Sequence, residues 1–189
     1  GADVSDLDAA VRALGAGGVV GVPTDTVYGL AVDPWNEAAV ATLFRLKGRP
    51  AGRPVGLLAA SPSQAAEVGD LRPASDLIRH WPGALTLVVR PRVVIPDWVG
   101  DSALQTVGIR VPDHPQLVRL LETTGPLAVT SANRSGEPEA LDDVTAREIF
   151  GDEVDVYLPG RCPGGTASTV VDATSHPPKV LRRGPVVIG

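Results

Sequence analysis

Helical and extended segments alternate along most of this 189-residue chain, and this alternation limits the fold more than any other feature of the sequence. The expected strands are short apolar runs, and the expected helices repeat apolar residues with a period near 3.6. Such alternation is typical of helices layered against a sheet. Strands that follow one another near the C-terminus favour some antiparallel pairing, so we predict an α/β fold with a mixed parallel and antiparallel sheet and flanking helices. The expected helices are 5–14, 36–47, 74–80, 115–122 and 142–150, and the expected strands are 19–22, 26–32, 55–60, 85–89, 107–111, 126–130, 154–158, 168–172 and 180–182.

Side chains that accept hydrogen bonds mark three of the expected helix starts. Ser5 is predicted to cap the first helix, with Asp8 three residues later in a position like that of a capping box. Asn36 is predicted to cap the second helix. His114, which precedes a proline, is interpreted as the cap of the fourth helix rather than as a catalytic residue.

Charge and composition disfavour several classes of protein. A formal net charge of −5 and a pI near 5.1 disfavour a non-specific nucleic-acid binder, which usually has a basic face. Cys162 is the single cysteine, so no internal disulfide forms, and no histidine lies at zinc-ligand spacing from it or from another histidine. No apolar run reaches the length that spans a membrane, and the N-terminus has no signal-peptide core. We expect a soluble, cytoplasmic protein.

Three basic residues, Lys47, Arg49 and Arg53, lie within seven residues at the end of the second helical segment. One interpretation is that these cations only complement the helix C-terminus. The other is a site for a triphosphate, because the glycine and proline residues between them make a stiff loop that loses little entropy on binding. The sequence has no G-x-x-x-x-G-K-[ST] or G-x-G-x-x-G motif, so neither a P-loop nor a Rossmann phosphate site is available.

Ser131 and Asn133 follow the strand at 126–130 and enter a turn. An ordinary Ser/Asn turn is one interpretation. A polar rim at a strand end, where α/β proteins commonly bind ligands, is the other.

Residues of the strand at 107–111 alternate, which places Thr106, Gly108 and Arg110 on one face. A buried arginine needs a partner. That partner is either a structural carboxylate or the carboxylate of a ligand, which an arginine can grip with two parallel hydrogen bonds.

Hydroxyl groups also cluster in residues 22–30, Val-Pro-Thr-Asp-Thr-Val-Tyr-Gly-Leu. Hydroxyl and basic groups that converge from separate segments suit a phosphorylated ligand. The glycine-rich start of the strand in 164–172 is a weak signal of a ligand site when taken alone. The cations in 181–184 are also a weak signal alone, since charged residues commonly protect a sheet edge. The segment 159–165 is rich in glycine and proline and is expected to be a mobile loop, with Cys162 as a bystander thiol.

Five motifs stand in a fixed order along the chain, and in this order they resemble the YrdC/TsaC family. The motifs are Pro23–Gly29, Lys47–Pro50, Ser131–Asn133, Ser168–Asp172 and Leu181–Gly184. The resemblance extends from Ser5 to Pro185 and is to the short, single-domain form. It implies that residues 1–189 form one YrdC-like domain with a concave ligand-binding face. It also implies a nucleotidyltransferase, an L-threonylcarbamoyladenylate synthase, that makes L-threonylcarbamoyl-AMP and pyrophosphate from L-threonine, bicarbonate or CO2, and ATP. This reaction is the first step of N6-threonylcarbamoyladenosine formation at position 37 of tRNA.

The resemblance also implies a role for individual residues. It implies Lys47 and Arg49 as catalytic residues. It implies Mg²⁺ bound through the ATP phosphates, with no metal ligand from the protein. The implied partners are ATP, L-threonine, bicarbonate and the downstream proteins that transfer the threonylcarbamoyl group to tRNA, with a weak contact to RNA and none to a membrane. The implied threonine contacts are Thr26, Arg110, Ser131 and Ser168, and the implied ATP contacts are Lys47, Arg49, Arg53, Thr106, Asn133 and Arg182.

Two positions depart from the family pattern. Leu58 stands where some members have a histidine, and Arg183 replaces the proline of Leu-Arg-Pro-Gly. We assign Arg182, rather than Arg183, to the nucleotide. Three alternative functions stay open: a family paralogue without synthase activity, a double-stranded-RNA-binding module, and a domain that uses carbamoyl phosphate, as in hydrogenase-maturation proteins.

Overall fold

The computed structural model describes residues 1–48 and 54–189, and in these residues all the strands join one sheet. The strand order is β7-β1-β2-β6-β3-β5-β4-β8-β9. The pairs β1–β7, β3–β5 and β4–β8 are parallel and the other neighbours are antiparallel, which confirms the predicted mixed sheet. The strands are β1 (Val20–Val22), β2 (Gly29–Val32), β3 (Leu57–Leu58), β4 (Leu85–Val89), β5 (Val107–Arg110), β6 (Leu127–Ser131), β7 (Val156–Tyr157), β8 (Thr169–Asp172) and β9 (Lys179–Arg182).

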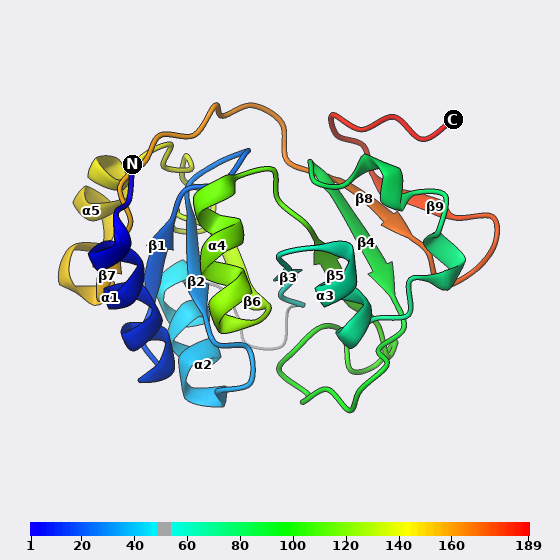
Figure 1. Cartoon of the computed structure of the whole chain (residues 1–189), viewed down its shortest axis with the longest axis horizontal. Coiled ribbons are helices and arrows are strands. Elements are labelled where there is room, and N and C mark those ends of the chain that lie inside the picture. The colour runs from blue at the N-terminus through cyan, green and yellow to red at the C-terminus, as the bar shows by residue number, and fades with distance from the viewer. Residues whose placement is uncertain (49–53) are drawn as a thin grey trace.

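The helices α1, α2, α4 and α5 gather around the β7-β1-β2-β6 end of the sheet, whereas α3 lies beside β3 and β5 and the strands β4, β8 and β9 extend away (Figure 1). Residues of α2 and α5 belong to one buried cluster and residues of α1 and α4 to a second, so the two helix pairs cover opposite faces. No helix among the described residues is long and apolar enough to cross a membrane. The helices are α1 (Val4–Gly15), α2 (Glu37–Lys47), α3 (Pro62–Val68), α4 (Pro115–Thr124) and α5 (Asp143–Phe150), with 3-10 turns η1 (Arg72–Ala74), η2 (Ile78–His80) and η3 (Gly151–Glu153).

The helix caps follow the prediction at two of three positions. The Asn36 side chain accepts a hydrogen bond from the Ala39 N–H, and His114 Nδ1 accepts one from the Leu117 N–H, so both predicted caps are confirmed. The predicted Ser5 cap is wrong. Asp3 caps α1 and forms a capping box with Asp6, because a carboxylate is the better acceptor beside the positive end of a helix dipole.

The predicted helix over 74–80 is also wrong. The chain forms the separate turns η1 and η2 there, because Pro82 favours an extended Trp81, which has φ −98° and ψ 143° and stops the helix. A helix that the prediction missed, α3, lies just before. Its start carries ordinary signals, because the Ser61 side chain accepts a hydrogen bond from the Gln64 N–H and Pro62 is the first helical residue.

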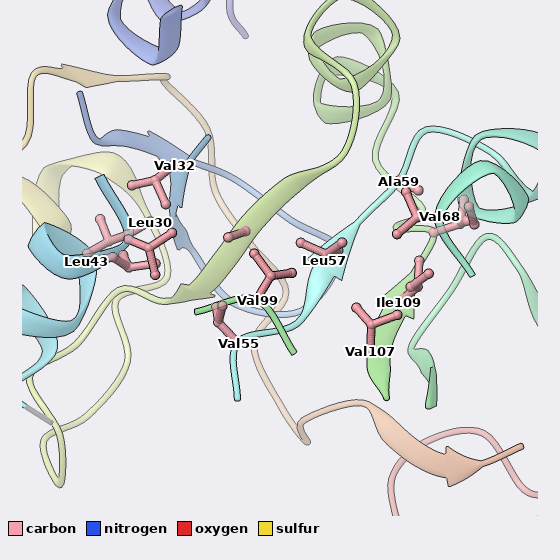
Figure 2. Close-up of a cluster of buried hydrophobic side chains, with 14 of the residues drawn as sticks. Leu30, Val32, Leu43, Val55, Leu57, Ala59, Val68, Val99, Val107 and Ile109 are labelled. Carbon is pink, nitrogen blue, oxygen red and sulfur yellow. The ribbon is translucent and has the colours of Figure 1, made fainter. Parts of the chain in front are cut away.

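The core covers one face of β4 and β8 and leaves the other face partly exposed. Figure 2 shows Leu43 of α2 beside Leu30 and Val32 of β2. Leu57 of β3 lies between this group and Ile109 of β5. In β4 and β8 the buried and partly exposed residues alternate, as expected for strands with one face in the core. The partly exposed residues of these strands include Thr86, Val88 and Val170, which line the cavity described next.

Candidate active site

A cavity of about 600 Å³ opens over the middle strands of the sheet and takes residues from β2, β3, β4, β5, β6, β8 and β9. This volume is typical of sites for small molecules. Asn133 does not line it, and Arg49 and Arg53 lie outside the described residues. The prediction that Thr106, Gly108 and Arg110 share one face is confirmed, because all three line the cavity. The predicted site residues in the lining are Thr26, Lys47, Thr106, Arg110, Ser131, Ser168 and Arg182.

Arg110 sits at the end of β5 and is held by a protein carboxylate beside the cavity. Its Nη1 donates to Asp25 Oδ1 at 2.6 Å and to the Gly83 carbonyl oxygen at 3.3 Å. Its Nη2 lies 3.5 Å from Thr26 Oγ1. The residue is only 7% exposed, so the charge needs this compensation. Asp25 is therefore the structural carboxylate that the first interpretation expected, while the same side chain lines the cavity, so a ligand carboxylate at Arg110 stays a prediction.

The Thr24–Thr26 turn brings hydroxyl groups to the cavity wall. Thr24 Oγ1 accepts from the Thr26 N–H at 3.0 Å, donates to the Val27 carbonyl oxygen at 2.6 Å and lies 3.0 Å from Thr26 Oγ1. Asp25 points to the β5–α4 connection, where its Oδ2 accepts from the Asp113 N–H at 3.0 Å. Sequence reasoning did not select Thr24 or Asp25. The residue types of the turn could have indicated that these residues form a turn. No local pattern in the sequence indicates that Asp25 pairs with Arg110, which is 85 positions away.

Lys47 is buried at the C-terminal end of α2 and its amine reaches the end of β6. Nζ donates to the Ser131 carbonyl oxygen at 2.9 Å, to Ser131 Oγ at 3.2 Å and to Asn133 Oδ1. Asn133 Oδ1 also accepts from Ser131 Oγ at 2.7 Å, and its Nδ2 donates to the Arg134 and Glu137 carbonyl oxygens. Asn133 is 7% exposed, so its side chain supports Lys47 from within the protein.

The C-terminal end of α2 is completed by other groups. Gly48 has a φ of +67°, a left-handed conformation that glycine adopts without strain, and Arg134 Nη1 donates to the Leu46 carbonyl oxygen at 3.0 Å. Arg134 also lies over the Phe150 ring at 4.9 Å. Arg134 therefore complements the C-terminal end of this helix together with the basic residues of its last turn, while the Lys47 amine is directed to Ser131 and the residue lines the cavity.

Arg182, on the edge strand β9, lines another side of the cavity. Its Nε donates to the Ser168 carbonyl oxygen at 3.0 Å and its Nη2 to Ser168 Oγ at 3.1 Å, while Ser168 Oγ lies 2.9 Å from Thr86 Oγ1. Gly184 packs against this segment so closely that a Cβ atom would lie 2.5 Å from the Ala167 carbonyl oxygen. Arg182 lines the cavity and Arg183 does not, and the assignment of Arg182 to the nucleotide stays a prediction.

The loop 159–165 is attached to the cavity wall by backbone hydrogen bonds. The Gly164 N–H donates to the Thr26 carbonyl oxygen at 2.8 Å, and the Cys162 N–H donates to the Leu141 carbonyl oxygen at 2.7 Å. Cys162 Sγ is buried and accepts a hydrogen bond from the Thr24 N–H. Burial raises the pKa of the Cys162 thiol above its usual value, in spite of Arg161 beside it in the sequence.

Known proteins share this sequence pattern. The sequence model of the Sua5/YciO/YrdC family, described as telomere recombination, matches residues 12–184. The chain belongs to this family. A Mycobacterium tuberculosis relative is 45% identical over 181 residues, which cover 94% of this chain and 83% of the relative. The threonylcarbamoyl-AMP synthase of Marinobacter nauticus is 40% identical over 164 residues, which cover 83% of this chain and 85% of that protein.

Solved structures of the Sua5/YciO/YrdC family share the fold. The crystal structure of P. abyssi Sua5 complexed with L-threonine superimposes with a TM-score of 0.84 and 34% sequence identity. The match covers 93% of this chain and 53% of Sua5, so this chain spans about half the length of that protein. The YrdC-like fold that the sequence predicts is therefore confirmed.

Proposed function

We propose that this protein is an L-threonylcarbamoyladenylate synthase, which converts L-threonine, bicarbonate or CO2, and ATP to threonylcarbamoyl-AMP and pyrophosphate. The observation that carries the proposal is one cavity lined by Arg110 and Thr26 on one side and by Lys47 and Arg182 on others. The family supports the same activity, because its Marinobacter nauticus member has this name and its P. abyssi member binds L-threonine.

L-threonine is proposed to bind at the Arg110 side. The Arg110 Nη2 edge, beside Thr26 Oγ1, is suited to the substrate carboxylate through charge-assisted hydrogen bonds. Ser131 and Ser168 offer hydroxyl groups on the cavity wall for the polar groups of the amino acid.

ATP is proposed to bind with its phosphates near Lys47 and Arg182. Arg49 and Arg53, which lie outside the described residues, follow Lys47 closely in the chain and are proposed to add charge there. Thr106 is proposed to contact the nucleotide directly, and Asn133 to contribute through Lys47. ATP is proposed to enter as its Mg²⁺ complex, with the phosphates and water as the ligands of the metal, because Mg²⁺ commonly keeps waters and relies on substrate phosphates.

The proposed reaction has two steps. The threonine amine adds to CO2 and loses one proton, which gives a carbamate. A carbamate oxygen then attacks the α-phosphorus of ATP, the bond to the bridging oxygen breaks, and pyrophosphate leaves with that oxygen. Both reactants of the second step are anions, so the protein contributes chiefly by neutralising charge and by holding the carbamate in line with the leaving group. The mixed anhydride is proposed to pass to proteins that modify tRNA.

Pyrophosphate release tests this proposal. With ATP, Mg²⁺ and bicarbonate, release is expected to depend on L-threonine and to be much slower with L-serine. Arg182→Ala removes a charge-assisted contact and is expected to raise the KM for ATP about tenfold, whereas the matched variant Arg183→Ala, outside the cavity lining, leaves it unchanged. Folded protein that releases no pyrophosphate in response to threonine would contradict the proposal and favour a paralogue without synthase activity.

A further inference from the structure

We propose that Asp25 is a positioning residue for the amino-acid substrate, because it fixes Arg110 with one edge of the guanidinium group directed to the cavity. This inference rests on the proposed function, which assigns the threonine carboxylate to Arg110. It adds a residue that the sequence motif alone did not single out, and it gives that residue a role distinct from contact with substrate.

Asp25 acts from behind the cavity wall. Its neighbours Thr24, Thr26 and Val27 line the cavity, but Asp25, which is within the described part of the chain, does not. Its two carboxylate oxygens have separate partners, because Oδ1 accepts from Arg110 and Oδ2 accepts from the Asp113 N–H. The carboxylate therefore joins the Thr24–Thr26 turn to both the end of β5 and the residues that follow it.

The two terminal nitrogens of the Arg110 guanidinium group have different partners. Nη1 is engaged by Asp25 at 2.6 Å and by the Gly83 carbonyl oxygen at 3.3 Å. Nη2 is directed toward Thr26 Oγ1, on the cavity wall. A guanidinium group is planar and rigid, so an anchor at Nη1 also fixes the direction of the Nη2 hydrogens. The side chains of Arg110 and Asp25 are 8% and 14% exposed, and this burial keeps water from replacing the anchor.

The contact between Asp25 and Arg110 also gives a reason to expect the opposite effect of Asp25 on threonine binding. A second carboxylate bound to Arg110 would share the positive charge with Asp25 and be repelled by it. If repulsion dominates, loss of the Asp25 charge improves threonine binding. If positioning dominates, the loss weakens threonine binding, because an arginine without its anchor takes several orientations and must be ordered by the ligand.

Asp25→Asn tests the two expectations, with Asp70→Asn as its matched control. Asp70 also pairs with an arginine, the exposed Arg72, at 2.9 Å, and it lies outside the cavity lining. We expect Asp25→Asn to raise the KM and the calorimetric Kd for L-threonine about tenfold or more, with the KM for ATP unchanged. We expect Asp70→Asn to change none of these values. Asp25→Glu keeps the charge but moves it by one methylene, and is expected to show a smaller increase in the KM for threonine.

Three results would overturn the inference: a KM for threonine in Asp25→Asn that is unchanged, one that falls, or one that rises in parallel with the KM for ATP. A crystal structure of Asp25→Asn gives a readout that is independent of activity, and Arg110 in its original orientation there also overturns it. Wild-type protein that neither binds threonine nor releases pyrophosphate would refute the proposed function. In that case, the Arg110 orientation in the variant still decides whether Asp25 is its anchor.

Discussion

Asn133→Ala is expected to destabilise the fold more than an ordinary asparagine substitution, because this side chain satisfies four groups at once. It accepts from Lys47 Nζ and from Ser131 Oγ, and it donates to the carbonyl oxygens of Arg134 and Glu137. A hydrogen bond to a charged group contributes about 1.5–3 kcal/mol, and a buried group left without a partner costs about 1–3 kcal/mol. Since water replaces part of this network, we expect a loss of about 3 kcal/mol in the free energy of unfolding.

Urea denaturation followed by circular dichroism measures this loss. With an m-value of about 2 kcal/mol/M, the midpoint should fall by about 1.5 M. The matched control is Asn36→Ala, which removes a single helix-cap bond, to the Ala39 N–H, and should cost about 1 kcal/mol, or about 0.5 M. Equal midpoints for the two variants would refute the conclusion that Asn133 is the internal support of Lys47.

Three further predictions use other parts of the molecule. Gly184→Ala places a methyl group against the backbone of Ala167 and should cost about 1–3 kcal/mol, whereas Gly15→Ala, where a Cβ meets nothing within 4 Å, should not destabilise the protein in the same thermal melt. Burial lowers the pKa of His114 below its usual 6.5, so the unfolded chain takes up the proton first as the pH falls. The free energy of unfolding should therefore fall as the pH drops below 6.5. His114→Asn keeps a helix cap without a titrating group, and denaturation at several pH values should show a flatter dependence for this variant. Burial raises the pKa of Cys162, so its alkylation at pH 7 should be slow in native protein and fast in urea, and rapid native labelling would contradict the buried thiol.

The parts of the site that could be predicted from sequence are those that depend on local rules. Strand alternation places Thr106, Gly108 and Arg110 on one face, and strand ends carry polar side chains. The parts that could not be predicted depend on contacts between distant segments. No local rule pairs Asp25 with Arg110, which lies 85 residues away.

The behaviour of Asn133 shows the same limit at short range. The sequence places it correctly at the end of a strand, in a turn that could expose it to a ligand. In the folded chain the carbonyl groups of Arg134 and Glu137 turn toward its Nδ2, and the Lys47 amine approaches its Oδ1 from α2. Each acceptor and donor of the side chain is thus used inside the protein, which depends on the conformation of the turn rather than on its composition.

The arginines on the two sides of the cavity differ in how their charge is compensated, and this difference bears on which ligand each side would receive. Arg110 is paired with the Asp25 carboxylate, so the field it presents to a ligand is reduced. Arg182 donates to the neutral Ser168 oxygens, and no carboxylate of the described residues lies within salt-bridge distance of it. A compensated arginine suits a singly charged group that must be oriented, and an uncompensated one suits a highly charged group that must be neutralised. This asymmetry supports the proposed orientation, with the amino-acid carboxylate at Arg110 and the phosphates toward Arg182.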